Sequence, residues 1–513
     1  MIELADLSLS IHGMPILRNV DLTVASGEIT GLVGESGSGK SMTALAMIGL
    51  LPSGATTTGA ITLDGRDLTH LRERDWLGIR GTDIGMIFQE PMTALNPVQT
   101  IGAQVCETLR LRGTPRPEAL RIARDRLDRV GLASIPLDRY PHELSGGQRQ
   151  RVCIALAIAH RPRLLIADEP TTALDVTTQA DILDLLRGLV RDGSDDGMAL
   201  LLITHDLGVV AGLADHVAVM RHGEIVERGR TETLFRTHAH AYTRDLLSAS
   251  RPLPRAARTI APSPVLQATD ITRSYGGFRA VADVNLTLNR GECLGLVGES
   301  GCGKSTLARA LLGLEPVQGG RIDLLGKPGG TAMTRADRAK ISVVFQDPYG
   351  SFNPRWTVRK LVQEPFHLTG CPRDAEARAT DALNQVGLTV GDLDKYPHEF
   401  SGGQRQRIAI ARALITEPEV LVLDEAVSAL DVRVRAQVLA LLENLQERLG
   451  LAYLFITHDL TVVRAIADRI LIMRAGRIVE QGQTAQVFDA PRHDYTRTLI
   501  AAAPVIPADW LAA

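Results

Sequence analysis

Several features are scarce in this sequence, and each scarcity excludes a class of protein. The five cysteines lie apart without CxxC spacing, which argues against a disulfide framework and zinc or iron–sulfur motifs and fits a reducing cytosol. The formal net charge is only −3, so there is no strong electrostatic case for binding nucleic acid. No apolar run approaches the length of a membrane-spanning helix, and the segment MIELADLSLSIHGM lacks the regions of a signal peptide.

Lysine is nearly absent. Arginine supplies 50 of the 56 basic residues, and the lysines are Lys40, Lys304, Lys327, Lys340, Lys360 and Lys395. Because Lys40 is the only lysine before residue 304, we expect this position to need a compact ammonium rather than a planar guanidinium.

What the sequence does contain is a tandem repeat. Four motifs occur twice in the same order: GLVGESGSGKS at 31–41 and GLVGESGCGKS at 295–305, YPHELSGGQRQR at 140–151 and YPHEFSGGQRQR at 396–407, LLIADEPTTALDV at 164–176 and VLVLDEAVSALDV at 420–432, LLITHDL at 201–207 and LFITHDL at 454–460. A proline-rich segment separates the copies. The 513 residues therefore predict a first domain at 1–249, a linker at 250–265 and a second domain at 266–513.

Each copy alternates short apolar runs with helical segments, which predicts an α/β domain with a mostly parallel sheet. In the first copy we expect strands at Ile29–Val33, Ile84–Phe88, Leu164–Ala167 and Leu200–Thr204, and helices at Lys40–Leu50 and Gln148–Ala159. Residues Glu3–Val24 and Gln267–Leu288 instead have the pattern of an antiparallel meander.

Two glycine-rich loops predict phosphate binding. Gly34–Ser41 and Gly298–Ser305 both have the pattern G-x4-G-K-S between an apolar strand and a helix. Such a P-loop curls its backbone N–H groups around phosphates, and the helix N-terminus adds its dipole. The lysine then reaches the β- and γ-phosphates, and the last serine binds Mg²⁺.

Paired acidic residues follow another strand of each copy. Asp168 and Asp424 end apolar runs, where a carboxylate can hold Mg²⁺ through water. Glu169 and Glu425 come next, where a general base for the attacking water belongs. Two P-loops with these carboxylates predict nucleotide hydrolysis in both copies.

The segments LSGGQ at 144–148 and FSGGQ at 400–404 resemble the signature of ATP-binding cassette (ABC) ATPases, and the resemblance covers nearly the whole chain. It implies an α/β fold of tandem P-loop NTPase domains, each with a mostly parallel sheet core, an antiparallel β subdomain and a helical signature subdomain. It also implies hydrolysis of ATP with Mg²⁺. Two cassettes of this family close head to tail, so Lys40 would share a site with Ser401, and Lys304 with Ser145.

The resemblance assigns site residues by position. The catalytic residues are Glu169 and Glu425 with the switch histidines His205 and His458, and the metal ligands are Ser41, Gln89, Asp168, Ser305, Gln346 and Asp424. In the first half the expected nucleotide-binding residues are Gly34, Ser36, Gly37, Gly39, Lys40, Ser41, Met42, Gln89, Ser145, Gly146, Gly147, Gln148, Asp168 and Asp175. In the second half they are Tyr275, Gly298, Ser300, Gly301, Gly303, Lys304, Ser305, Thr306, Gln346, Ser401, Gly402, Gly403, Gln404, Asp424 and Asp431.

The halves differ at two positions. Tyr275 lies where the family has an aromatic residue that stacks on adenine, whereas the matching Ile11 would leave adenine on an aliphatic side chain or on His12. Cys302 replaces Ser38 in the second P-loop. The adjacent helix N-terminus and lysine predict a lowered thiol pKa and a reactive cysteine. The alternative is a buried, unreactive side chain of serine size.

Other segments resemble the ATPases of peptide and nickel importers: EPMTALNP at 90–97, DPYGSFNP at 347–354, YPHE before each signature, HAHAYTRDLL at 238–247 and RHDYTRTLI at 492–500. The first half is similar to the D-type subunit and the second to the F-type. This resemblance implies two integral membrane permease subunits and an extracytoplasmic solute-binding protein as partners, no nucleic acid, and a place on the cytoplasmic face of the membrane. The clustered cysteines that hold an iron–sulfur cluster in some members are lacking, so no cluster is expected.

Three alternatives belong to other classes. A sugar-importer ATPase is also a tandem cassette, but its second P-loop and signature are usually degraded. A soluble translation-associated tandem cassette would have a long charged helical linker, and a DNA-repair cassette would have zinc-ligand cysteine clusters. The solute itself is left open (dipeptide, oligopeptide, glutathione or nickel chelate), because other subunits select it.

Overall fold

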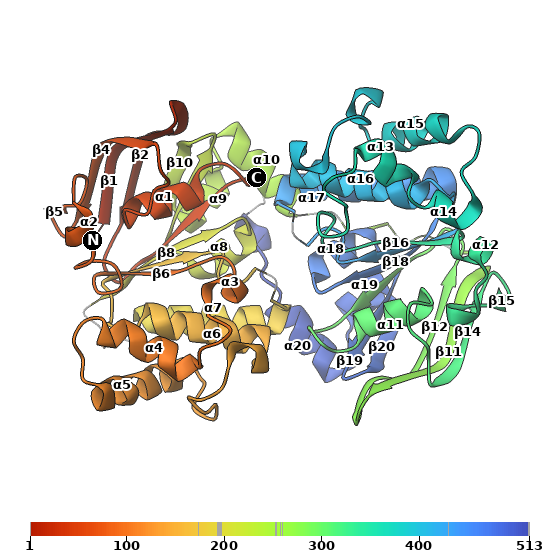
Figure 1. Cartoon of the computed structure of the whole chain (residues 1–513), viewed down its shortest axis with the longest axis horizontal. Helices are drawn as coiled ribbons and strands as arrows, with labels where there is room; N and C mark the ends of the chain where they lie inside the picture. Colours follow the sequence, from red (N-terminus) through yellow and green to blue (C-terminus); the bar gives the residue numbers. More distant parts are fainter. Residues whose placement is uncertain are drawn as a thin grey trace. The chain divides into compact units, whose positions relative to one another are not determined.

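The computed structural model describes residues 2–172, 174–191, 197–251, 254–256, 258, 260–428 and 430–510. The chain divides into two compact units that contain nearly the same series of elements (Figure 1). The first unit takes in Met1–Leu174, Thr178–Ser250 and Pro504–Ala513, and the second takes in Asp175–Thr177 and Arg251–Ala503.

The described residues of the first half form the following strands and α-helices. The strands are β1 (Ile2–Ile11), β2 (Met14–Val24), β3 (Ile29–Val33), β4 (Ala55–Leu63), β5 (Arg66–Asp67), β6 (Ile84–Ile87), β7 (Leu164–Asp168), β8 (Ala199–Thr204), β9 (His216–Arg221) and β10 (Glu224–Arg230). The helices are α1 (Lys40–Met47), α2 (Glu73–Trp76), α3 (Pro91–Ala94), α4 (Ile101–Arg110), α5 (Arg116–Arg129), α6 (Gly146–Ala157), α7 (Val176–Arg191), α8 (Leu207–Leu213), α9 (Thr231–Thr237) and α10 (Ala241–Ser250).

The second half repeats the series. The strands are β11 (Pro264–Tyr275), β12 (Phe278–Asn289), β13 (Cys293–Val297), β14 (Gly319–Leu324), β15 (Lys327–Pro328), β16 (Ile341–Val344), β17 (Val420–Asp424), β18 (Ala452–Thr457), β19 (Arg469–Arg474) and β20 (Arg477–Gln483). The helices are α11 (Lys304–Leu311), α12 (Arg335–Arg338), α13 (Val358–Gln363), α14 (Phe366–Thr369), α15 (Ala375–Gln385), α16 (Gly402–Leu414), α17 (Val432–Leu449), α18 (Leu460–Ile466), α19 (Thr484–Asp489) and α20 (Asp494–Ala502).

Each unit combines two sheets. In the first unit, β2-β1-β4-β5 form an antiparallel sheet, and β10-β9-β3-β8-β7-β6 form a sheet that is parallel except for β10. The second unit has the matching orders β12-β11-β14-β15 and β16-β17-β18-β13-β19-β20. These sheets confirm both the predicted parallel core and the predicted antiparallel meanders.

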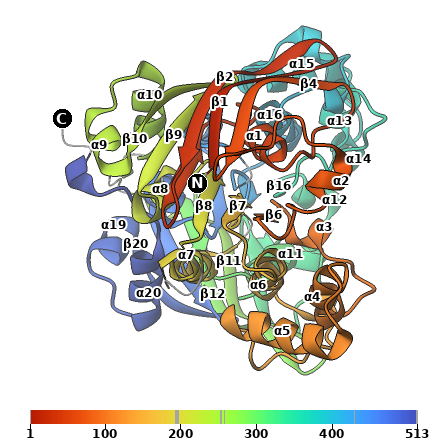
Figure 2. The same ribbon diagram turned by 90° about the vertical axis from the view of Figure 1, so that its left-hand side faces the viewer.

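The parallel strands are apolar throughout because both of their faces are covered. On β7, Leu164 and Ile166 belong to the core shared with β1, β2 and α1, whereas Leu165 and Ala167 belong to the core shared with α6 and α7. Figure 2 shows the antiparallel sheet and helices α4–α6 on opposite sides of β6–β8, as in Figure 1. Alternate residues of one strand therefore join the two layers of the unit.

Helix ends differ slightly from the predicted ones, for local reasons. Helix α1 ends at Met47, three residues before the expected end, because Gly49 has a left-handed φ of 63°. Helix α6 begins at Gly146, two residues before the expected start, because the Ser145 side chain caps it.

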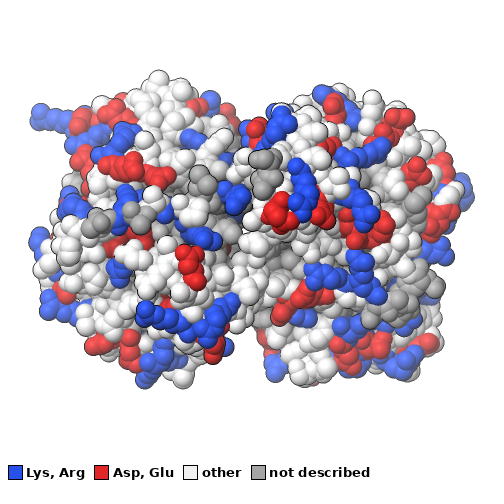
Figure 3. Space-filling model, turned by 180° about the vertical axis from the view of Figure 1, so that it is seen from behind, with Lys and Arg blue, Asp and Glu red and all other residues white. Residues whose placement is uncertain are grey.

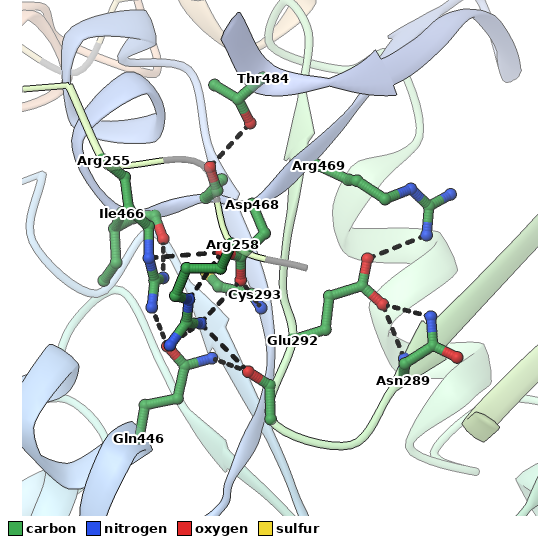
Figure 4. Close-up of polar contacts among 12 residues, drawn as sticks. Arg255, Arg258, Asn289, Glu292, Cys293, Gln446, Ile466, Asp468, Arg469 and Thr484 are labelled. Carbon is green, nitrogen blue, oxygen red and sulfur yellow. Dashed lines mark hydrogen bonds and ion pairs between the residues drawn. The ribbon is translucent and has the colours of Figure 1, made fainter. Parts of the chain in front are cut away.

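Two arginines of the predicted linker lie against the second unit (Figure 4). Arg258 Nε and Nη2 donate to the carboxylate of Asp468 at 3.1 and 3.0 Å, and Arg255 Nε lies 3.4 Å from the same group. Arg255 also donates to Gln446 Oε1 at 2.7 Å. The Asp468 side chain is only 2% exposed, so the arginines neutralise a buried charge. Pro252, Leu253, Ala257 and Thr259 of the linker lie outside the described residues.

The segment Pro504–Trp510 belongs to the first unit, although it follows the second in the sequence. Arg236 of α9 donates to the Asp509 carbonyl at 2.7 Å and pairs with the Asp509 carboxylate at 2.5 Å. The Trp510 ring meets Phe235 edge to face, with the centroids 6.3 Å apart.

Charges of both signs are intermixed over the face of each unit that Figure 3 shows, in keeping with the small net charge. Among the described residues, none of the helices combines the length and apolarity needed to cross a bilayer.

Candidate active site

The predicted site residues of each unit meet at one edge of the parallel sheet. Strands β3, β8, β7 and β6 are neighbours and run in the same direction, so their carboxyl ends lie together. The P-loop follows β3, His205 follows β8, Asp168 and Glu169 lie at the end of β7, and Gln89 follows β6. Strands β13, β18, β17 and β16 repeat the arrangement in the second unit. Ligands of open α/β sheets bind at this edge.

The first P-loop has the geometry of a phosphate cradle. Gly39 adopts a left-handed φ of 109° and is the N-cap of α1, and a Cβ at Gly34 would lie 2.2 Å from the Met220 carbonyl oxygen. Only glycine fits both positions. Lys40 Nζ donates to the carbonyl oxygens of Gly34 at 2.8 Å and Glu35 at 2.9 Å, so the ammonium lies inside the curl of the loop.

The second P-loop repeats this geometry closely. Gly303 has φ 112°, and Lys304 Nζ donates to the carbonyl oxygens of Gly298 at 2.7 Å and Glu299 at 2.8 Å. Of the remaining positions named from the sequence, Ser36, Gly37, Ser300 and Gly301 lie in the loops. The first turns of the helices contain the others, Ser41 and Met42 in α1 and Ser305 and Thr306 in α11.

The predicted lowering of the Cys302 thiol pKa is wrong. Its side chain is buried at 7% exposure, and this desolvation raises the thiol pKa more than the ammonium of Lys304, 3.9 Å away, lowers it. The helix N-terminus and lysine argued for a thiolate, but burial outweighs them. Cys302 is the buried serine-sized side chain of the alternative interpretation.

Asp168 offers a suitable oxygen for a cation. Its Oδ1 is buried without a hydrogen-bond partner. Burial and the adjacent Glu169 charge raise the pKa of Asp168, although the nearby Ser41 hydroxyl lowers it. Burial likewise raises the pKa of Asp424. A buried carboxylate oxygen beside a serine hydroxyl is a ligand pair that fits Mg²⁺.

Glu169 is held by three side chains from different parts of the chain. Its Oε1 lies 3.1 Å from His205 Nδ1, and its Oε2 accepts from Gln89 Nε2 at 3.0 Å and from the Thr172 hydroxyl at 2.9 Å. Burial alone would raise the pKa of Glu169, but the hydrogen bond and charge of His205 dominate and lower it to about 2. The carboxylate is therefore ionised at neutral pH and can accept a proton or orient a water molecule.

The second unit repeats two of these three contacts, whereas Ser428, in the place of Thr172, donates to the Glu425 backbone carbonyl at 2.9 Å. Glu425 Oε1 lies 3.2 Å from His458 Nδ1, and Oε2 accepts from Gln346 Nε2 at 2.8 Å. The pKa of Glu425 is lowered, because His458 outweighs burial. The glutamine amides contact the glutamates here, and their role as metal ligands stays a prediction. Thr172 was not foreseen; its place three residues after Glu169 is the signal that could have found it.

The signature motifs begin helices. Ser145 and Ser401 are the N-caps of α6 and α16, and each forms a capping box with the glutamine three residues later. Ser145 and Gly146, like Ser401 and Gly402, are exposed. A Cβ at Gly147 would lie 2.4 Å from Thr178 Cγ2, and one at Gly403 would lie 2.3 Å from Val434 Cγ1, so these glycines permit close packing.

The remaining predicted residues have local structural roles as well. Asp431 Oδ1 caps α17 by accepting from the Val434 N–H at 3.0 Å, and Asp175 Oδ1 accepts from the Thr177 hydroxyl at 2.8 Å.

The candidate adenine platforms differ between the units. Tyr275 is 42% exposed, with the Arg273 guanidinium 4.7 Å from its ring centroid, so the ring is partly accessible for stacking. Ile11 lies at the end of β1, and the neighbouring His12 ring lies so close to Gly54 that a Cβ there would be 2.4 Å away.

Comparison with known proteins places the chain in a class. Residues 17–172 and 281–428 match the ABC transporter family, and residues 226–273 and 479–512 match the C-terminal region of oligopeptide/dipeptide transporters. The chain is an ABC ATPase, which binds and hydrolyses ATP. Within that class it belongs to the oligopeptide/dipeptide transporter family.

Relatives match along almost the whole length. The peptidoglycan transport ATP-binding protein YejF of Agrobacterium fabrum is 46% identical, over 98% of this chain and 96% of its own. The glutathione import ATP-binding proteins GsiA of Escherichia coli K12 and Salmonella typhimurium are each 45% identical, over 95% of this chain and 86% of theirs. The solved structure of CbiO1 from Clostridium perfringens, part of an ABC transporter complex, is 32% identical and covers 44% of this chain and 92% of its own, with a TM-score of 0.41.

Proposed function

We propose that this chain is the energy-coupling subunit of an ABC importer for peptides or peptide-like solutes. The observation that carries the proposal is the match of both halves to the C-terminal region of oligopeptide/dipeptide transporters. Each half also has a P-loop, a signature, and the aspartate, glutamate and histidine of an ATP site. Relatives named for peptidoglycan transport and glutathione import support a solute with peptide bonds. We propose 1–249 and 266–513 as the two nucleotide-binding domains along the sequence, with Pro504–Trp510 at the end of the second belonging to the first compact unit.

Each P-loop lysine binds the phosphates, and the buried aspartate with the P-loop serine holds Mg²⁺, which neutralises charge on the phosphates when it is bound. Glu169 and Glu425 orient and deprotonate the attacking water, and His205 and His458 hold those carboxylates by the hydrogen bonds described above. Tyr275 stacks on one adenine. The exposed N-termini of α6 and α16 supply the N–H groups of the signature to a γ-phosphate, in the head-to-tail pairing that the family resemblance implies.

The partners we propose are two integral membrane permeases and an extracytoplasmic solute-binding protein, with this chain peripheral at the cytoplasmic face. No iron–sulfur cluster and no nucleic acid take part in this function.

Uptake of labelled solutes tests the proposal. A strain that lacks this gene is compared with strains that carry the wild type or the double variant Glu169→Gln, Glu425→Gln. We expect only the wild type to restore uptake of a labelled dipeptide, oligopeptide or glutathione. Restored uptake of a labelled sugar, with peptide uptake unchanged by the deletion, would instead make the chain a sugar-importer ATPase.

A further inference from the structure

In each unit a buried tyrosine from the C-terminal region contacts the P-loop. The Tyr242 hydroxyl oxygen accepts a hydrogen bond from the Glu35 backbone N–H at 3.1 Å, and that of Tyr495 accepts from the Glu299 N–H at 3.2 Å. The tyrosines are 1% and 4% exposed. They lie in the repeated YTR segments, which have no assigned role in the ATP site described above.

The N–H that each tyrosine binds belongs to a peptide group already engaged at its other end. The carbonyl of that group is Gly34 C=O in the first unit, which accepts from Lys40 Nζ at 2.8 Å, and Gly298 C=O in the second, which accepts from Lys304 Nζ at 2.7 Å. Because a peptide group is planar, fixing its N–H also fixes the direction of its carbonyl. The tyrosine hydroxyl and the lysine ammonium therefore lie at opposite ends of one rigid unit.

The tyrosines are themselves fixed by contacts outside the P-loop. The Tyr242 N–H donates to His240 Nδ1 at 3.1 Å, and the Glu227 carboxylate on β10 accepts from the His240 N–H at 3.2 Å. The guanidinium of Arg221, at the end of β9, lies 4.8 Å from the Tyr242 ring centroid. The β9–β10 hairpin thus holds the hydroxyl independently of the loop.

The second unit has the same contacts. The Tyr495 N–H donates to His493 Nδ1 at 3.0 Å, Glu480 on β20 accepts from the His493 N–H at 3.0 Å, and Arg474 lies 4.7 Å from the ring centroid. Burial raises the pKa of Tyr495, so its hydroxyl stays neutral at pH 7.

We propose that Tyr242 and Tyr495 are positioning residues of the two ATP sites. Each hydroxyl holds the first peptide group of the P-loop in the orientation that keeps its carbonyl, and through it the lysine ammonium, on the phosphate side of the loop. This inference rests on the proposed phosphate site. It gives the C-terminal region a direct part in nucleotide binding.

The test removes only the two hydroxyls from the full chain. The double variant Tyr242→Phe, Tyr495→Phe keeps both rings and their arginine contacts. We expect the Kd for a fluorescent ATP analogue and the KM for ATP to rise about three- to tenfold, with a smaller change in kcat, because one hydrogen bond that orients the lysine is lost.

Tyr453→Phe is the matched control. Tyr453 on β18 is fully buried, and its hydroxyl donates to the Leu442 carbonyl at 2.9 Å, away from the P-loop. We expect this variant to lower the melting temperature about as much as a lost buried hydrogen bond does elsewhere, with the Kd unchanged. An equal rise in Kd for Tyr453→Phe would overturn the inference, as would an unchanged Kd for the Tyr242, Tyr495 pair.

A double-mutant cycle shows whether the tyrosines act through the lysines. On a Lys40→Met, Lys304→Met background, the two Tyr→Phe substitutions should not weaken the residual binding further. A full additional loss would mean that the tyrosines act by another route and would overturn the inference. Unchanged ATP affinity after the lysine substitutions alone would refute the phosphate site itself, which is a separate failure.

Discussion

The two units agree at the reacting groups and differ at their margins. The glutamate–histidine distances are 3.1 and 3.2 Å, and the glutamine–glutamate distances are 3.0 and 2.8 Å. The units differ at the aspartate that directly precedes β9 in the first unit and β19 in the second. These residues, Asp215 and Asp468, form ion pairs with different partners. Asp215 is 28% exposed and pairs with Arg191 of α7 at 2.7 Å, whereas Asp468 is 2% exposed and pairs with the linker arginines.

Both aspartates also accept from a strand N–H, that of Ile29 or Cys293, at 2.9 and 2.8 Å. In both units the aspartate therefore stabilises the start of a parallel strand. The arginine that balances its negative charge comes from α7 in the first unit and from the linker in the second. Hydrolysis needs fixed distances among several groups, but charge balance needs only a cation within reach.

The largest effect should come from the shared geometry. The double variant Glu169→Gln, Glu425→Gln should bind ATP but lose about two to four orders of magnitude in hydrolysis, because only the general base is removed. If the two sites are equivalent, the single variants should be equally impaired in steady-state ATPase assays. Glu118→Gln, on the exposed face of α5, is the control and should have wild-type activity. Hydrolysis by the double variant above about a few per cent of the wild-type rate would contradict the assignment of these glutamates as general bases, because loss of a general base should cost more than that.

The next effect separates the units by stability. Asp468→Asn leaves two linker arginines beside a neutral group, so we expect about 3 kcal/mol loss of unfolding free energy. Asp215→Asn, whose partner is solvated, should lose about 1 kcal/mol or less. Urea denaturation followed by circular dichroism measures both. Equal losses would show that the buried pair and the exposed pair do not differ in energy.

A smaller difference is expected at the adenine platforms. Stacking of a base on an aromatic ring contributes roughly 1–3 kcal/mol, so Tyr275→Ala should weaken one nucleotide-binding step about tenfold, and Ile11→Ala much less. Calorimetric titration of the full chain with ATP and Mg²⁺ resolves the two steps. Equal weakening by both variants would remove the asymmetry.

The smallest contrast concerns the P-loop cysteine. Burial raises the pKa of Cys106, Cys153, Cys293 and Cys302, whereas Cys371 is exposed. Maleimide at pH 7 should therefore modify Cys371 first, because the thiolate is the reacting form and access is needed. Peptide mapping by mass spectrometry gives the order, and early labelling of Cys302 would contradict the buried assignment.

The sequence predicted what depends on nearest neighbours along the chain. Strand positions, to within one residue, and the glycine-rich turn before α1 were foreseen because each is set by a few consecutive residues, whereas the serine cap of α6 was missed. The hydrogen bond between Gln89 and Glu169 joins residues 80 positions apart, and that between Glu35 and Tyr242 spans 207. Such contacts depend on how the layers pack, which no local pattern encodes. The prediction of a lowered pKa for Cys302 failed for the same reason, because the burial of a side chain is a property of the folded unit.

The position of the segment Pro504–Trp510 affects whether the gene can be split into two genes, one for each half. Its residues cover Phe235 and Arg236 of the first unit, but they are encoded after everything that builds the second. If the gene were divided at the linker, this segment would be encoded with the second half, and the aromatic surface that it covers on the first half would be exposed. Fission into two working genes would therefore require a new covering for that surface, whereas point changes within either half would not.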